Sequence, residues 1–299
     1  MNDRYKELKD DIKKAVALIE DYMEGCFSED DKDILTATKA MKYSLFAGGK
    51  RLRGYLVLAF CRAFGGRDEA ALPFAAAIEM IHAYSLIHDD LPCMDDDNMR
   101  RGKPTNHKVF GEAVAVLAGD GLLTKAFGVA ASNAHVSSNS ALEAVVLLSE
   151  AASEKGMIGG QIMDMYGEEH RLSLEELKKL HRLKTGALIA VSAKLGAVAA
   201  GVSLADERAV CAAGYAEELG LAFQIRDDIL DVIGDEATLG KPIGSDAENS
   251  KNTFLTHMSL EDAKKYTSEL TENAKRHLAD IKETKLLLDL ADMMLERNV

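Results

Sequence analysis

Proline is scarce in this sequence. Only four prolines occur among 299 residues, at positions 73, 92, 104 and 242, whereas Ala, Leu, Glu and Lys are abundant between them. Proline breaks helices, and the four abundant residue types favour them. Long stretches without a helix breaker, in a chain that is 47% apolar, therefore predict an all-α protein with a substantial core and argue against a disordered one.

Positive charge is in deficit as well. The 36 Lys and Arg residues face 49 Asp and Glu residues, so the formal net charge is −13. Sequence-independent binding of nucleic acid relies on clustered Lys and Arg side chains. We therefore expect no nucleic-acid partner.

Features of secreted and membrane proteins are also missing. The four cysteines form no CxxC pair and are typical of reduced thiols. The first 23 residues are charged and amphipathic, without the apolar core of a signal peptide. The most membrane-like window, 186–205, is rich in Ala and Gly and contains Lys194, which favours a buried core helix. We expect a soluble, cytoplasmic protein with no membrane span.

Apolar residues recur at spacings of three and four almost throughout, as in amphipathic helices. This periodicity predicts helices at 3–26, 32–46, 51–64, 68–91, 111–134, 139–156, 173–200, 204–233, 259–282 and 284–297. Glycine-containing or charged breaks separate them, including IGGQ at 158–161. No Pro/Ser-rich linker and no repeat is present, so we expect one large helical bundle and a single domain spanning 1–299.

A DDxxD motif lies near the end of the predicted helix 204–233. Asp227 and Asp231 are four residues apart and share a helix face, about 6 Å from each other. Like charges at this spacing destabilise a helix, and the surrounding residues are apolar. A multivalent cation would relieve the repulsion.

A second acidic motif, DDxxxxD, follows the apolar stretch before residue 89. On a straight helix Asp95 would lie about 120° away from Asp89. Pro92 stands between them, where a helix is expected to distort. We therefore predict that residues 91–94 bulge or kink and return Asp95 to the side of Asp89.

The two motifs offer only carboxylates, without paired His or Cys ligands. Such donors suit Mg²⁺ or Mn²⁺ rather than Zn²⁺. A solvated acidic face would explain one such motif, but two of them, each closing an apolar helix, favour a metal site that binds phosphate.

Basic residues gather at the breaks between helices, where a phosphate ligand could be held. Two glycines precede Lys50 and Arg53 at a predicted helix start, and Arg100 and Arg101 directly follow the first acidic motif. A P-loop is excluded because GxxxxGK[ST] is missing. Further basic groups interrupt or follow later helices: Lys184 in KTG, Lys241 and Lys251.

These motifs occur in a recognisable order: GGKRLR, HDDLPCMDDDNMRRGKPT, KTGAL, FQIRDDILD and GKPIGSD. The set, which covers roughly residues 40–297, resembles the trans-isoprenyl diphosphate synthases, and most closely the bacterial short-chain type that makes farnesyl diphosphate. The resemblance implies an all-α antiparallel helical barrel around a deep central cavity (the isoprenoid synthase fold), and a homodimer.

The resemblance also implies residue roles. Two or three Mg²⁺ ions, or Mn²⁺, would be held on an allylic diphosphate by Asp89, Asp95 and Asp227, with Asp90 and Asp231 as supporting ligands. The same diphosphate would contact Arg100, Lys184, Thr185, Gln224 and Lys241. Isopentenyl diphosphate would bind to Lys50, Arg53, His82 and Arg101. Two positions depart from the family pattern: Gly54 replaces a usual Pro, which is expected to loosen the helix start, and Asn252 replaces a Ser or Thr, which weakens the assignment of Lys251.

The implied reaction is Mg-assisted ionisation of dimethylallyl or geranyl diphosphate, followed by head-to-tail condensation with isopentenyl diphosphate. Tyr84, five residues before Asp89, resembles an aromatic floor that stops the chain at farnesyl length, and Ser85 lies beside it. The first motif is also similar to plant-type geranylgeranyl synthases, so C10 and C20 products stay open.

Three other functions fit parts of the pattern. A terpene cyclase would not need the second cationic group around Arg53. A non-catalytic partner subunit tends to lose one acidic motif, whereas both are present here. A metal-dependent HD phosphohydrolase, suggested by His88–Asp89, needs further His and Asp ligands.

Overall fold

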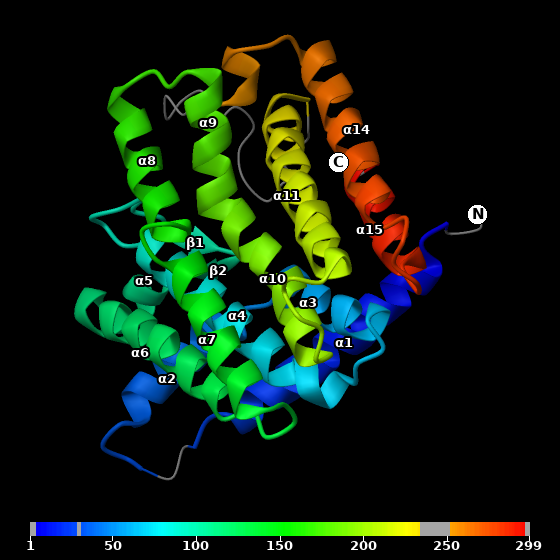
Figure 1. Cartoon of the computed structure of the whole chain (residues 1–299). Coiled ribbons are helices and arrows are strands. Elements are labelled where there is room, and N and C mark those ends of the chain that lie inside the picture. The colour runs from blue at the N-terminus through cyan, green and yellow to red at the C-terminus, as the bar shows by residue number, and fades with distance from the viewer. Residues whose placement is uncertain (1–3, 29–30, 234–251, 297–299) are drawn as a thin grey trace.

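The computed structural model describes residues 4–28, 31–233 and 252–296 of the chain. Most of these residues are helical, which confirms the all-α prediction. The longer helices are α1 Lys6–Gly25, α2 Leu35–Leu45, α3 Leu52–Ala63, α4 Asp68–Asp89, α6 Glu112–Ala131, α7 Ser138–Ala152, α8 Met157–Glu169, α9 Leu174–His181, α10 Ala187–Ala199, α11 Glu207–Ile233, α14 Leu260–His277 and α15 Lys285–Leu295. Figure 1 shows α8, the continuous run of α9 and α10, α11 and α14 standing side by side.

Short elements lie between the long ones. A short hairpin pairs two strands of two residues each, β1 Met99–Arg100 and β2 Lys103–Pro104, and leads into α5 Asn106–Phe110. A π-helical turn, η1 Arg182–Gly186, joins α9 to α10, and a 3₁₀ turn, η2 Phe254–Thr256, precedes α14. The interruption predicted at Lys184–Gly186 is therefore this π turn, which keeps the chain helical throughout 174–199.

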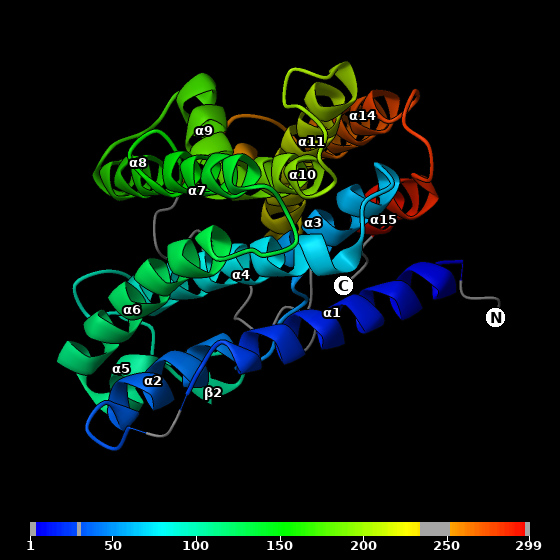
Figure 2. The ribbon, with the colours of Figure 1, turned by 60° about the horizontal axis from the view of Figure 1, so that its bottom comes forward.

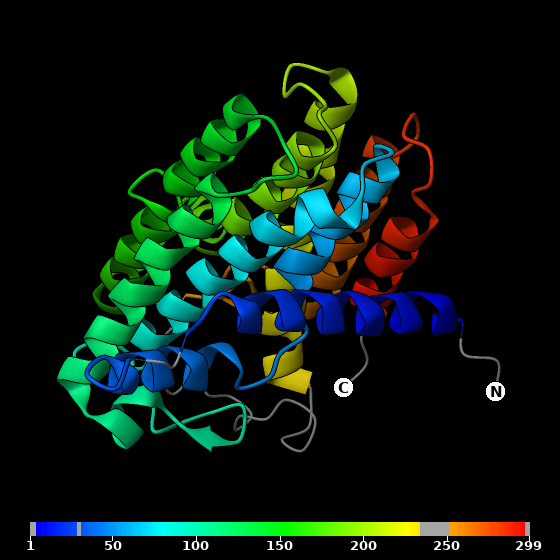
Figure 3. The same cartoon turned by 90° about the horizontal axis from the view of Figure 1, so that it is seen from below.

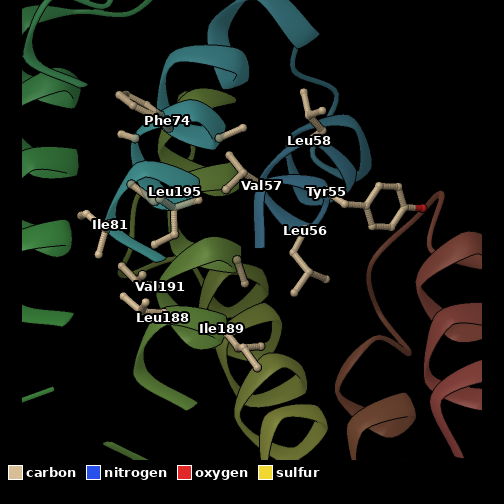
Figure 4. Packing of buried hydrophobic residues seen from close by; sticks show 14 of the residues in the cluster. Tyr55, Leu56, Val57, Leu58, Phe74, Ile81, Leu188, Ile189, Val191 and Leu195 are labelled. Atoms are coloured by element: carbon tan, nitrogen blue, oxygen red, sulfur yellow. The ribbon is translucent and has the colours of Figure 1, made fainter. Parts of the chain in front are cut away.

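Helix α4 is central to the bundle. It packs against α3, α6, α10 and α1, and Figures 2 and 3 show α1 passing across the lower side of this group. Figure 4 shows Phe74 and Ile81 of α4 facing Leu188, Val191 and Leu195 of α10. A smaller cluster of Leu177, Leu221, Ala222, Ile225, Ile229, Phe254, Ala263 and Leu270 surrounds the last turns of α11.

Side-chain caps fix two helix starts. The hydroxyl of Ser173 accepts a hydrogen bond from the Glu176 N–H, and the Glu176 carboxylate accepts one from the Ser173 N–H, which forms a reciprocal capping box. Ser259 caps α14 through the Asp262 N–H. Both starts lie within two residues of their predicted positions.

One predicted break is wrong. The IGGQ segment lies inside α8 rather than between helices. A Cβ on Gly160 would collide with the backbone of Leu183 and Lys184. Gly160 is therefore a close-packing position and not a helix end.

The two most membrane-like helices of the described structure lie outside the window 186–205, which the sequence marked as the most membrane-like. Within the described residues, α4 and α6 are long and apolar enough to cross a membrane, whereas the window 186–205 contains the shorter, buried α10. Most of the apolar stretch of α4 is buried in the protein, but only a third of that of α6 is. Helix α4 is thus a core helix, and α6 leaves an apolar face uncovered.

Candidate active site

Helix α4 ends at Asp89, and the chain then turns back on itself. The Asp95 N–H donates to the Asp89 carbonyl oxygen at 2.9 Å, and the Met94 N–H donates to the Leu91 carbonyl at 2.8 Å. The predicted return of Asp95 to Asp89 is confirmed. It occurs by helix termination rather than by a kink, because Pro92 lies beyond the last helical residue.

Burial makes the Asp89 carboxylate hard to ionise. Burial raises the pKa of Asp89 to about 6, with Asp95 adding to the rise and Lys184 opposing it. A carboxylate that is desolvated beside a second one is stabilised by a cation. The end of α4 is therefore suited to receive positive charge.

Asp90 points into a different environment. It is buried, and its carboxylate accepts a hydrogen bond from Nε of Arg100 at 2.6 Å. Arg100 also reaches Asp97 at 3.4 Å. The two adjacent aspartates thus diverge: Asp89 faces a cavity beside the end of α4, and Asp90 orients an arginine in a smaller pocket.

A cavity of about 380 Å³ opens beside the end of α4. Its charged and polar wall includes Asp89, Arg53, His82, Ser85, Lys184 and Thr185, and its remaining wall is formed by Tyr84, Leu86, His88, Met94, Met157, Ile158, Gln161, Ile162 and Met165. The predicted central cavity is therefore present, with ionic groups at one end and apolar side chains from α4 and α8.

The π turn presents Lys184 and Thr185 to this cavity. The Lys184 ammonium forms an ion pair with Asp164 of α8. Burial opposes the positive charge, but Asp164, Asp89 and Asp95 outweigh it and raise the pKa of Lys184. The Thr185 hydroxyl donates to Oε1 of Gln224 at 2.7 Å. A π turn at such a position is frequent at functional sites.

The Thr185–Gln224 hydrogen bond connects the cavity to the second acidic motif. Helix α11 runs without interruption to Ile233, so Asp227 and Asp231 share one face as predicted. Asp231 is buried, and Asp227 is partly buried. Asp228 instead binds the backbone before α14: its Oδ2 accepts a hydrogen bond from the Phe254 N–H at 2.7 Å.

A cationic group lies beside the cavity. Arg51 and Arg101 line a smaller pocket with Arg100, and His82 lines both this pocket and the main cavity. Burial and the nearby arginines hold the pKa of His82 well below its usual value, so the imidazole is neutral. The Nε atom of Arg53 is buried without a hydrogen-bond partner among the described residues, and burial lowers the Arg53 pKa.

The glycines before α3 let Arg101 approach the backbone. The Arg101 guanidinium donates to the Gly48 carbonyl. Gly49 has φ +130°, and a Cβ there would lie 2.8 Å from a guanidinium nitrogen. Lys50 lies exposed at the end of this loop. Both glycines are thus required by the local backbone geometry.

Gly54 uses the N–H that proline would lack. This N–H donates to the buried Glu79 carboxylate at 2.9 Å, and Glu79 also lies 3.8 Å from the Arg51 guanidinium. The expected loosening is not seen, because α3 begins at Leu52 and Gly54 is buried within its first turn.

Asn252 and two predicted lysines lie further along the chain. Asn252 accepts the Leu172 N–H at 2.9 Å and donates to the Gly167 carbonyl at 2.5 Å. It therefore ties this segment to the connection between α8 and α9. Lys241 and Lys251 lie outside the described residues.

Sequence reasoning missed the contribution of α8. The glycines of IGGQ concealed an apolar spacing of three and four through Ile158, Ile162 and Met165, and with it the partner of Lys184, Asp164. It also missed Glu79, whose only signal was a lone charge in an apolar helix.

The carboxylates fit a hard divalent cation. Asp89 and Asp95 repel each other at a partly buried site, and all the donors are oxygens. Within residues 4–28, 31–233 and 252–296, no three potential ligands already converge on one point. Mg²⁺ characteristically takes one or two carboxylates and fills its shell with water and phosphate oxygens.

Comparisons with known proteins agree with this geometry. A model of the polyprenyl synthetase family matches residues 35–291. The chain is 47% identical to farnesyl diphosphate synthase of Bacillus subtilis (strain 168), over 87% of the chain and 88% of the relative. It is 51% identical to farnesyl diphosphate synthase of Geobacillus stearothermophilus, over 80% of the chain and 81% of the relative.

A solved structure supports the fold. Geranylgeranyl pyrophosphate synthetase from Pyrococcus horikoshii superposes with a TM-score of 0.90 and 32% identity, covering 99% of this chain and 100% of that one. The match extends over nearly all the helices described above. The chain therefore belongs to the polyprenyl synthetase family and is a prenyltransferase with the all-α isoprenoid synthase fold.

Proposed function

We propose that the protein condenses isopentenyl diphosphate with dimethylallyl and geranyl diphosphates and releases farnesyl diphosphate. One observation carries the proposal: a single cavity is lined by Asp89, Lys184 and Thr185, by Arg53 and His82, and by an apolar wall. Two anionic head groups and one hydrocarbon chain can thus be held together. Relatives that make farnesyl diphosphate support the C15 product.

The allylic diphosphate is assigned to the end of α4. Asp89, Asp95 and Asp227 would hold Mg²⁺ on it, with Asp231 as a further ligand, and Mn²⁺ is an alternative ion. Asp90 stays a proposed supporting ligand, although its pairing with Arg100 favours an orienting role. The direct diphosphate contacts proposed are Arg100, Lys184, Thr185, Gln224 and Lys241.

Isopentenyl diphosphate is assigned to the cationic group. Arg53 and His82 face the main cavity, Arg101 lies beside His82, and Lys50 precedes the same helix. A dianion would supply the buried Arg53 Nε with an acceptor. His82 would donate one hydrogen bond to the same diphosphate.

The cavity then promotes the reaction by charge and position. Bound Mg²⁺ supplies Lewis acidity that stabilises the leaving diphosphate. Lys184 adds a second positive group, which Asp164 holds in place. The apolar side chains of α4 and α8 exclude water from the reacting carbons. The carbon–oxygen bond to the allylic diphosphate breaks first, the double bond of isopentenyl diphosphate then attacks the resulting allylic cation, and the departing diphosphate accepts the proton that the new cation loses.

One assay tests the proposed function. The protein is incubated with dimethylallyl and isopentenyl diphosphates and Mg²⁺, and products are identified by mass. We expect mainly the C15 diphosphate. A C20 product would instead favour the geranylgeranyl type, and a C10 product the geranyl type. A cyclic hydrocarbon would indicate a terpene cyclase, release of phosphate without condensation a phosphohydrolase, and no reaction a non-catalytic subunit.

Tyr84 is proposed as the floor that limits the chain, with Ser85 beside it. Both line the cavity one turn of α4 or more below Asp89. Replacing Tyr84 by Ala removes the ring, so we expect the ratio of C20 to C15 product to rise by about tenfold or more. Tyr84→Phe keeps the ring and removes only a hydroxyl that has no hydrogen-bond partner among the described residues, so it should leave the ratio near that of the wild type. An unchanged ratio in Tyr84→Ala would exclude the ring as the floor.

A homodimer is proposed through the exposed face of α6 and α7. Val116 and Leu117 are 39% and 64% exposed, and Leu142 and Val146 are 63% and 47% exposed. Apolar patches of this kind mark interfaces, and a second copy offers the same face in a two-fold arrangement.

Light scattering should give twice the chain mass of 32.4 kDa. Leu117→Asp should shift the protein to monomer, because the interface would then bury an unpaired charge. Val210→Asp, at another exposed apolar residue, should remain dimeric. A monomeric wild type, or a dimeric Leu117→Asp variant, would contradict the interface.

We further propose one catalytic domain spanning residues 1–299 and a cytoplasmic location. The family match over 35–291 supports the single domain. The burial of α4, together with the proposed dimer on α6, accounts for the two most apolar helices without a membrane.

A further inference from the structure

His88 lines the cavity and also forms a hydrogen bond to the neighbouring helix α6. Its Nε2–H donates to the Val116 carbonyl oxygen at 3.0 Å. The imidazole lies over Gly119, where a Cβ would overlap the ring and would lie 2.9 Å from Cε1. The absence of a side chain at 119 therefore creates the space that the imidazole occupies.

His88 also contacts Tyr84. The two rings are four residues apart on α4 and meet edge to face, with centroids 5.7 Å apart. The Tyr84 hydroxyl is buried and has no hydrogen-bond partner among the described residues. Packing, rather than a hydrogen bond, thus fixes the Tyr84 ring, and His88 provides one side of that packing.

We propose that His88, seated on Gly119, is a positioning residue that determines product length by holding the Tyr84 ring across the cavity. The proposal rests on the proposed synthase function. It assigns no proton transfer to His88. The role follows from geometry: the imidazole is fixed to α6 at one end and supports the cavity floor at the other.

The arrangement predicts opposite effects from two small changes. His88→Ala removes the support, so the Tyr84 ring can tilt away and the ratio of C20 to C15 product should rise about tenfold. Gly119→Ala displaces the imidazole toward the cavity, so the space for the chain shrinks and the ratio of C10 to C15 product should rise by a similar factor.

A double variant tests whether the two residues act through one contact. In His88→Ala/Gly119→Ala the added methyl group no longer meets a ring. We therefore expect the product ratio of His88→Ala alone, so that the effect of Gly119→Ala disappears. Gly128→Ala on the same helix is the matched control, because a Cβ there meets nothing within 4 Å. It should keep the wild-type ratio.

The experiment measures products from dimethylallyl and isopentenyl diphosphates by mass, together with the thermal midpoint and the solution mass of each variant. Opposite shifts in the single variants, with the Gly119→Ala effect lost in the double variant, would support the proposal. Unchanged ratios in an active, folded His88→Ala would overturn it, as would additive effects in the double variant. If the wild type itself forms no prenyl diphosphate, the proposed function fails instead.

Should His88→Ala not fold, a second variant replaces it. His88→Gln can keep the hydrogen bond to Val116 but lacks the ring, so it distinguishes support by the ring from support by the hydrogen bond. A wild-type ratio in folded His88→Gln would then overturn the proposal.

Discussion

Replacing Asp89 by Asn is expected to lower kcat by about 10³-fold, the size of effect seen when one group that stabilises transition-state charge is removed. The amide keeps the shape of the carboxylate but contributes no negative charge to a cation. Asp89 lies at the polar end of the cavity, within the field of Lys184 and Asp95. Loss of its charge removes a principal proposed ligand, whereas the fold of α4 is unaffected.

Initial rates at several Mg²⁺ concentrations test this result. The Asp89→Asn variant should need more Mg²⁺ for half-maximal rate and should not regain the wild-type kcat at saturation. Asp96→Asn is the matched control. Asp96 lies in the same turn, is exposed and has φ 50°, a conformation that Asn tolerates. A normal kcat in Asp89→Asn would contradict the assignment of the metal to this motif.

Replacing Arg53 by Met is expected to raise the KM for isopentenyl diphosphate by about 10²-fold, since a hydrogen bond to a charged group contributes up to about 3 kcal/mol. The thermal midpoint should stay equal or rise. The reason is that the Arg53 Nε is buried with no hydrogen-bond partner in the part of the chain that the structure describes, and burial lowers its pKa. An apolar side chain of similar length removes this cost. Glu79 keeps its bonds to Gly54 and its proximity to Arg51.

The separate KM values locate the effect. The KM for the allylic substrate should change little, because Lys184 and Thr185 are untouched. Arg53→Lys keeps the charge but not the planar guanidinium, so its KM for isopentenyl diphosphate should lie between those of the wild type and Arg53→Met. An Arg53→Met variant that loses stability, or whose defect lies in the allylic KM, would show that Arg53 supports the fold or the other substrate.

Local sequence determined much of this protein. Scarce proline and a spacing of three and four were sufficient for most helices, because both properties act within one or two turns. The same locality placed Asp227 and Asp231 on one face and indicated that the chain must distort near Pro92. The charged motifs, read in order, were sufficient to name the family.

Tertiary packing decided the rest. Asp89 and Asp90 are adjacent and identical in sequence, yet one faces the cavity and the other holds Arg100. The start of helix α8 was not predicted because glycine disfavours a helix locally. Gly160 is nevertheless required there, because α8 packs closely against the π turn. Asp164 with Lys184, Glu79 with Gly54, and His88 with Gly119 all join segments 20 or more residues apart. Periodicity carries no information about such partners, because they are selected by the space and charge that remain once the helices have packed.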